Sequence, residues 1–449
     1  MFERFLPGLR LSLVLGLGLL LACGTAAAPP SGPAAQKADG SSAAPTAAAT
    51  QAPTPTEIAS QEAPTTLTAA PETAVTPSPT ATPKPTLSSE GKALQKQLRD
   101  AGISTFGWKT DFSKRSVEFS EISSGGPPRD GIPPIDEPVF TTFDDADGWL
   151  DAKEPVIALE IDGDARAYPL QILTWHEIVN DQVGGVPVSV TFCPLCNSAI
   201  TFDRRLDGVV HDFGTSGNLR NSDLIMWDRQ TETWWQQLTG EGIVGELTGK
   251  RLTFLPSAVI SWEDFKATYP DGQVLSRETG FNRRYGENPY VGYDRADSPP
   301  FLFRGDLDGR LLPKERVAAV NIGNVDAAFP FTTLTEERVV NYTVGGQDLV
   351  VFFKPGTRSA LDQLLIGDSR EVGATGVFLP ELNGQKLTFR AEGDKFIDNE
   401  TGSTWSLLGQ AIEGPSAGQQ LTPIVHANHL WFAWAAFKPD TLIYQGASS

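Results

Sequence analysis

The sequence predicts a mainly β protein, a β-rich α+β fold whose core is an internally duplicated pair of related β lobes packed as one unit. Short alternating apolar runs between Gly- and Asp-containing turns outnumber the helical stretches. An ordered series of matches relates two halves of the chain. Every Trp and Tyr lies beyond residue 91, and the roughly 350 residues there suffice for one large domain or two ordinary ones.

Residues 1–23 are typical of a lipoprotein signal peptide. Two arginines flank the start of an apolar run too short to span a bilayer comfortably. The run ends in Leu-Ala-Cys-Gly, which predicts cleavage before Cys23, acylation of that residue and anchoring to the cell membrane by lipid. An uncleaved anchor and ordinary secretion are the alternatives. Each of these routes places the globular part outside the cytoplasm.

Residues 24–90 contain no aromatic residue and are rich in Ala, Pro, Thr and Ser, so they predict a disordered linker. The formal net charge of the chain is −19, which argues against nucleic acid as a partner. The charge identifies no other partner. The predicted membrane contact is therefore the N-terminal lipid, and a small-molecule or envelope partner stays open.

The internal duplication divides the globular part into a first copy, residues 91–300, and a second copy, residues 301–449. Residues 157–169 align without a gap to residues 318–330. Further pairs keep the same order along both copies, and they include Asn180 with Asn341, Trp235 with Trp405 and Trp262 with Trp431. A long ordered series of matches is much stronger than a single motif.

Several elements are predicted in order along the first copy. The segments on either side of Asp162-Gly163-Asp164 alternate and predict a β-hairpin. Residues 186–192 predict a strand that leads directly to Cys193. The best helical candidates are Leu94–Ala101, Pro169–Val179 and Ser261–Tyr269.

The strongest chemical signal is Cys193-Pro-Leu-Cys196, the only cysteine pair beside Cys23. A C-x-x-C turn places two soft sulfur donors together, where they bind a metal or form a disulfide. In the alignment of the two copies, Cys193 faces Lys354 and Cys196 faces Thr357. Chemistry is expected where one copy has changed, so the first copy carries the thiols.

The second copy carries the reverse difference, because His426 and His429 face Ser257 and Ile260. We therefore expect one site between the copies, in which Cys193, Cys196, His426 and His429 bind copper or zinc, with a possible redox role. His176 faces Glu337 and is a further candidate, as a metal ligand or as a catalytic general base.

Other interpretations of these residues stay open. The two cysteines form a structural disulfide in a non-catalytic envelope module that binds through its Trp residues. His426 and His429 are core histidines beside Trp431 and Trp434. His176 serves a hydrolase or transferase, with Glu177 and Asp181 as neighbouring carboxylates. The polar segments 214–223 and 283–290 are pocket walls or simple turns.

These residues lie in motifs that resemble a bacterial and archaeal family of unknown function, DUF3179. The matching segments cover about residues 115–449 and are residues 130–136, 175–180, 192–196, 214–217, 221–223, 228–231 and 285–290. The resemblance implies an exported protein and supplies no established reaction. The metal hypothesis therefore depends on the residues themselves.

Overall fold

The structure, a computed structural model, describes residues 88–447, which belong to one compact unit. The predicted signal peptide, Cys23 and nearly all of the predicted linker lie outside the described residues. The first helix, α1, spans Ser89–Asp100, so the final two residues assigned to the linker are helical. Within residues 88–447, no helix is long and apolar enough to cross a membrane.

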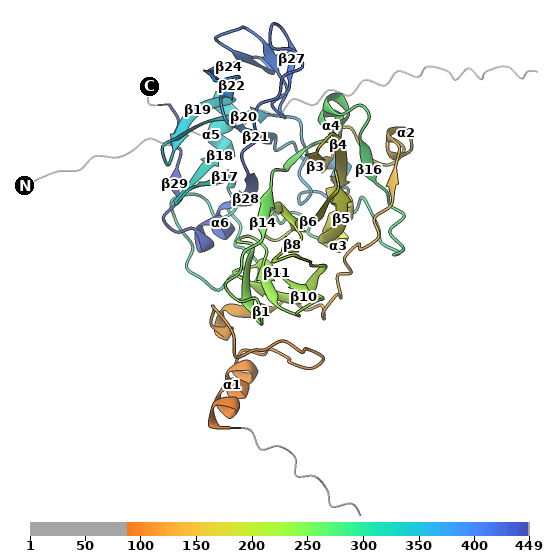
Figure 1. Ribbon diagram of the computed structural model, residues 1–449, viewed down its shortest axis with the longest axis vertical. Helices are drawn as coiled ribbons and strands as arrows, with labels where there is room; N and C mark the ends of the chain where they lie inside the picture. Colours follow the sequence, from red (N-terminus) through yellow and green to blue (C-terminus); the bar gives the residue numbers. More distant parts are fainter. Residues whose placement is uncertain (1–87, 448–449) are drawn as a thin grey trace, which may run out of the picture. The chain divides into compact units, whose positions relative to one another are not determined.

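The prediction of a mainly β protein is confirmed, and the strands of the first half form four sheets (Figure 1). In spatial order these sheets are β1 (Ile122–Ser124), β10 (Phe213–Arg220), β11 (Asp223–Asp228), β12 (Trp234–Gln236) and β13 (Glu241–Val244); β14 (Thr253–Leu255), β7 (Ser198–Asp203), β6 (Val186–Cys193) and β5 (Ile178–Val183); β15 (Ala258–Ser261), β3 (Pro155–Ile161), β4 (Asp164–Pro169), β16 (Gln273–Leu275) and β2 (Phe140–Thr141); and β8 (Arg205–Leu206) with β9 (Val209–Val210).

The strands of the second half also form four sheets. They are β28 (His426–Leu430), β17 (Arg316–Ile322), β18 (Val325–Pro330) and β29 (Leu442–Ile443); β19 (Val339–Val344), β20 (Gln347–Lys354) and β21 (Ala374–Phe378); β24 (Phe389–Glu392), β25 (Lys395–Asp398), β26 (Thr404–Trp405) and β27 (Ala411–Glu413); and β22 (Glu381–Leu382) with β23 (Gln385–Lys386).

The helices are short and lie between strands. Besides α1 they are α2 (Phe143–Ala146), α3 (Leu170–His176), α4 (Trp262–Thr268), α5 (Phe331–Glu337) and α6 (Trp431–Phe437), with 3₁₀ turns at Phe119–Glu121 and Ile366–Asp368. Helix α3 ends three residues before the predicted end because Glu177 adopts a left-handed conformation, φ 59°. The chain then continues directly into β5.

From β3 to β16 and from β17 to β29 the strands and α-helices follow the same order, except that β14 has no counterpart in the second half. The sheet order β15-β3-β4-β16 corresponds to β28-β17-β18-β29, and in both the last pair is parallel although the rest is antiparallel. Asn180 exchanges two hydrogen bonds with the backbone of Phe213, and Asn341 exchanges the same two with Phe389. The duplication stays a prediction, and these correspondences, which include side-chain contacts, are ones that it would produce.

The hydrophobic core is shared between the halves. One cluster combines Ile260 and Trp262 of the first half with Phe352 and Trp405 of the second. A second cluster joins the cysteines to residues of β17, β28 and α6, among them Leu430. Each half therefore buries part of its apolar surface against the other, which positions the turn after β6 next to β28.

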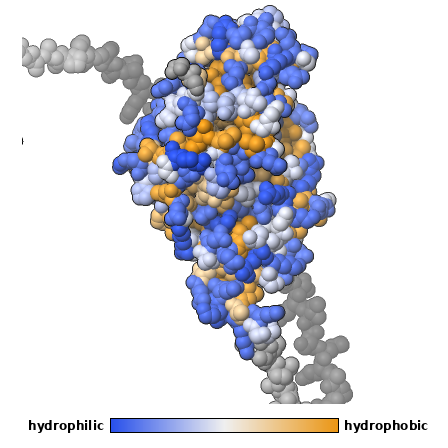
Figure 2. Space-filling view, turned by 90° about the vertical axis from the view of Figure 1, so that its left-hand side faces the viewer, coloured by the Kyte–Doolittle hydropathy of each residue, from blue (hydrophilic) through white to orange (hydrophobic). Residues whose placement is uncertain are grey.

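The surface is mixed in character. Figure 2 views the side that bears the second half and shows an apolar band between polar and charged regions. Apolar atoms supply more than half of the surface of most folded proteins, so the band by itself identifies no partner.

Candidate functional site

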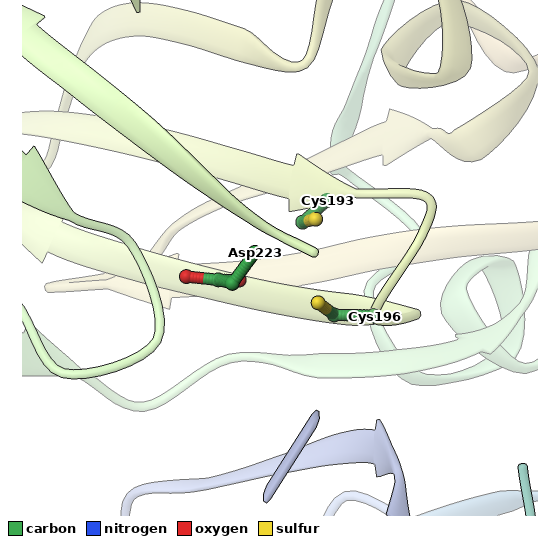
Figure 3. A group of neighbouring side chains, drawn as sticks. All are labelled: Cys193, Cys196 and Asp223. Atoms are coloured by element: carbon green, nitrogen blue, oxygen red, sulfur yellow. The ribbon is translucent and has the colours of Figure 1, made fainter. Parts of the chain in front are cut away.

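Three potential metal ligands meet where two hairpins approach each other. Strand β6 ends at Cys193, and a four-residue turn carrying Cys196 leads into β7. The hairpin of β10 and β11 has a two-residue turn, Asn221-Ser222, and Asp223 is the residue after it. The two cysteine Sγ atoms and a carboxylate oxygen of Asp223 lie within 4.8 Å of one another (Figure 3). All three residues are buried.

The carboxylate of Asp223 has one free oxygen. Its Oδ2 accepts hydrogen bonds from the Gln236 side chain at 2.6 Å and from the Leu238 backbone N–H at 2.9 Å. Its Oδ1 is fully buried without a hydrogen-bond partner in residues 88–447. Burial raises the pKa of Asp223 to about 6. An unpaired buried acceptor is costly, so this oxygen is available to a ligand.

The thiols lie in the same apolar surroundings. Burial raises the pKa of both Cys193 and Cys196. The Cys193 thiol is 3.7 Å from the Ser222 carbonyl oxygen, to which it donates. Without a cation both sulfurs are therefore protonated at neutral pH, and a bound metal ion would displace those protons.

Glu177 adds a second buried carboxyl group to this region. It is 7% exposed, and burial followed by repulsion from Asp223 raises its pKa to about 8. The pKa of Tyr290 is also raised, mainly by burial and to a smaller extent by the charges of Glu177 and Cys193. No cationic side chain is among the main causes of the pKa shifts of the two carboxyl groups and the two thiols. A cation would relieve their mutual repulsion.

The predicted histidine ligands do not join this cluster. In the described part of the chain, Cys193, Cys196 and Asp223 are the one group of at least three His, Cys, Asp or Glu residues whose ligand atoms are neighbours. The group contains no histidine. The halves do meet here, because the Leu430 backbone N–H donates to the Cys196 carbonyl at 2.9 Å. His426 and His429 lie in β28, where residues three apart point to opposite faces of a strand.

Each of these histidines has other surroundings. The His426 ring nitrogens lie 3.2 Å from the carbonyl oxygens of Ile424 and Thr375. The His429 ring stacks on Trp434 with centroids 5.1 Å apart. Burial lowers the pKa of His429 to about 3, so its imidazole is neutral.

His176 lies in a separate network. Its Nδ1 donates to the Pro133 carbonyl at 2.7 Å, so its Nε2 accepts from the Tyr285 hydroxyl at 2.6 Å. Burial lowers the pKa of His176 to about 4. Of the expected carboxylate neighbours, Asp181 binds Arg166 and Tyr168, and Glu177 lies beside Asp223. Neither orients the imidazole as a general base requires.

His211, the remaining histidine, binds a structural carboxylate. Its Nδ1 lies 3.1 Å from Asp228, which also accepts from Thr231 and from the Trp235 indole at 2.9 Å. In the second half Asp398 accepts equivalent bonds from Thr401 and Trp405. The Thr and Trp contacts occur in both halves and are explained by folding, whereas the histidine contact is found in the first half alone among the described residues.

The sequence interpretation placed Asp223 in a pocket wall or turn and not among the metal ligands, and it treated Glu177 only as a neighbour of His176. The signal for Asp223 was present, because Asn221-Ser222 is a turn sequence between two strand-like segments. Residues 214–217, expected to be a polar loop, instead lie in β10. A bulge between Thr215 and Asn218 lets these polar residues pair as a strand.

Comparison with known proteins identifies the family of this chain. The family model "Protein of unknown function (DUF3179)" matches residues 129–441, and the chain belongs to this family. No curated protein and no solved structure matches it.

Proposed function

We propose that this protein is a lipid-anchored, extracytoplasmic protein that binds a transition metal ion through Cys193, Cys196 and Asp223. The observation that carries the proposal is the convergence of two thiols and a carboxylate within 4.8 Å, all of them buried. The unpaired Oδ1 of Asp223 supports it. So does the accumulation of acidic groups, since a divalent cation compensates buried negative charge.

The donor set favours zinc over copper. Thiolate sulfur suits both Cu(I) and Zn²⁺, whereas a carboxylate oxygen is a common zinc ligand and a poor partner for Cu(I). Three protein ligands also leave a fourth tetrahedral position, which a water molecule or a substrate would occupy. The histidine pair is not part of this revised set.

Zinc titration of the reduced protein against a chromophoric chelator tests the proposal. We expect one zinc ion per chain in the parent protein and at least a tenfold loss of affinity in Cys193→Ser, Cys196→Ser and Asp223→Asn. Asp394→Asn is the matched control. Asp394 lies at the turn between β24 and β25 in the second half, and its side chain is 72% exposed. Its replacement should leave zinc affinity unchanged.

Two results would contradict the proposed site. If His426→Asn and His429→Asn weakened zinc binding as much as Cys193→Ser, the original four-ligand set would be restored. The second result is a protein purified from its envelope with no metal and no titratable thiol. That outcome would identify a Cys193–Cys196 disulfide and favour the non-catalytic binding module, because an exported C-x-x-C pair is readily oxidised.

The lipid anchor depends on Cys23 alone and is tested separately. We expect the parent protein in the membrane fraction and Cys23→Ser in the soluble fraction after export. Incorporation of a labelled fatty acid into the parent but not the variant would assign the modification to this residue. Equal membrane retention of both proteins would show that the apolar segment anchors the chain uncleaved.

A further inference from the structure

Two cavities lie in the cleft between the halves, apart from the cysteine cluster. The first has a volume of about 540 Å³ and the second about 390 Å³. Leu255, Ser257 and His426 line both and form the wall between them. Volumes of this size are ordinary for small-molecule sites.

The inferred duplication relates the two cavities to each other. Ala319 lines the first where its aligned residue Ala158 lines the second, and Leu238 and Leu408 correspond in the same way. Residues at aligned positions in the two halves thus line the two cavities. Their differences indicate which one has acquired chemistry, because folding alone explains what they share.

The charges of the two cavities are opposite. The first is lined by three cationic residues and one acidic residue, and the second by three acidic residues and one cationic residue. The first set is Arg220, Arg251, Lys438 and Glu241, and the second is Glu160, Asp162, Asp203 and Arg205. In a chain of net charge −19, a locally cationic cavity selects anions against the overall repulsion.

These cations have partners of their own, but the pairs are weak ones. Arg251 binds Glu241, Lys438 binds Asp326 and Arg220 binds Glu121. All three pairs reach solvent, and exposed ion pairs contribute little. An incoming anion can therefore share these donors at small cost.

His429 gives the first cavity a polar group that the second cavity lacks, because the first half has Ile260 at the position aligned with His429. The side chain is 2% exposed and lines the cavity. Its Nδ1 is buried without a hydrogen-bond partner in the described residues. A neutral imidazole offers one donor and one acceptor, so the ring has unused hydrogen-bonding capacity in a cavity whose lining also includes the apolar residues Ile200, Phe254 and Phe437.

We infer that the first cavity is a binding site for a small amphipathic organic anion. An apolar body would pack on the aliphatic and aromatic wall, and a carboxylate or similar group would lie toward Arg220, Arg251 and Lys438. His429 would hydrogen-bond to the ligand. This inference does not depend on the metal proposal, because none of the three proposed metal ligands lines the cavity.

Calorimetric titration with octanoate tests the inference. The protein is the full chain carrying Cys23→Ser, which removes the predicted acylation site. We expect octanoate to bind at one site and at least tenfold more tightly than 1-octanol or octylammonium, with an affinity that falls as salt is added. Lys438→Gln and His429→Asn should each weaken octanoate binding severalfold.

Matched cavity-filling variants separate this site from its counterpart. Val425 lines only the first cavity and is 36% exposed, and Leu408 lines only the second. We expect Val425→Trp to lower octanoate affinity at least tenfold and Leu408→Trp to leave it unchanged, with thermal unfolding verifying that both fold. Equal effects of the two variants, no octanoate binding, or tighter binding of octylammonium would overturn the inference. Val425→Trp should leave zinc binding intact.

Discussion

At the scale of single residues, the clearest consequence of the site is the cost of ionising Glu177. Its pKa is about 8 in the folded protein against an ordinary value of 4.5, because of burial and the nearby Asp223. The unfolded state loses this proton near pH 4.5, and the folded state keeps it until about pH 8. The free energy of unfolding therefore falls as pH rises through that window.

Glu177→Gln should remove this penalty in zinc-free protein. We expect the variant to be more stable than the parent by about 1–3 kcal/mol at pH 7, with a smaller difference at pH 5 and none below pH 4.5. Urea unfolding at several pH values measures it. The control is Glu336→Gln, an exposed position on α5, which should change little. A variant less stable than its parent at pH 7 would show that the ionised carboxylate has a favourable partner.

The sequence identified some site residues and missed others for definite reasons. Cys193 and Cys196 are local to one turn, so their proximity follows from spacing alone. Asp223 lies thirty residues away, and only the pairing register of β10 with β11 brings it to the thiols. The two histidines were predicted as ligands because they stand where the first copy has Ser257 and Ile260. Both lie in β28, and neither belongs to the cluster of Cys193, Cys196 and Asp223.

At the scale of elements, the site depends on the turn between β10 and β11. Asn221 and Ser222 have φ angles of 51° and 65°, as the two central residues of a type I′ turn require. Asn tolerates this left-handed region, whereas a β-branched residue does not. Because Asp223 follows the turn directly, its position is set by the turn.

Asn221→Val should therefore affect both folding and metal binding. We expect a loss of stability of about 1–2 kcal/mol and at least a threefold loss of zinc affinity. The control is Asp162→Val in the turn between β3 and β4, where Asp162 and Gly163 also have positive φ, 50° and 85°. That variant should lose similar stability and bind zinc normally. If both variants bind zinc equally well, the turn does not position Asp223.

Elements were predictable where local signals agreed. The β3–β4 hairpin follows from its turn sequence, and the strand leading to Cys193 follows from its alternation; both are confirmed. The end of α3 was misplaced because helical periodicity continued past Glu177, whose backbone conformation is imposed by the start of β5. The polar strand β10 was missed because its two glycines, its serine and its asparagine favour turns unless a neighbouring strand pairs with them.

At the scale of the whole molecule, the two halves share their cores. Ile260 of β15 packs in a cluster that also contains Val350 and Phe352 of β20. The cysteine turn belongs to a cluster with Leu430 and Trp431. The sequence predicted an internal repeat but not this reciprocal packing, since no local pattern records which half covers which face. We therefore expect that neither half is stable on its own.

Shared packing predicts that both halves unfold together. Ile260 is fully buried, so Ile260→Ala should lower the free energy of unfolding by about 2–4 kcal/mol. Native-state hydrogen exchange should report the same loss at the slowest amides of β6 in the first half and of β20 in the second. Val291→Ala, at a side chain that is 57% exposed, should change neither. A loss confined to the first half would mean that the halves are separate folding units, and the cleft between them would then open without global unfolding.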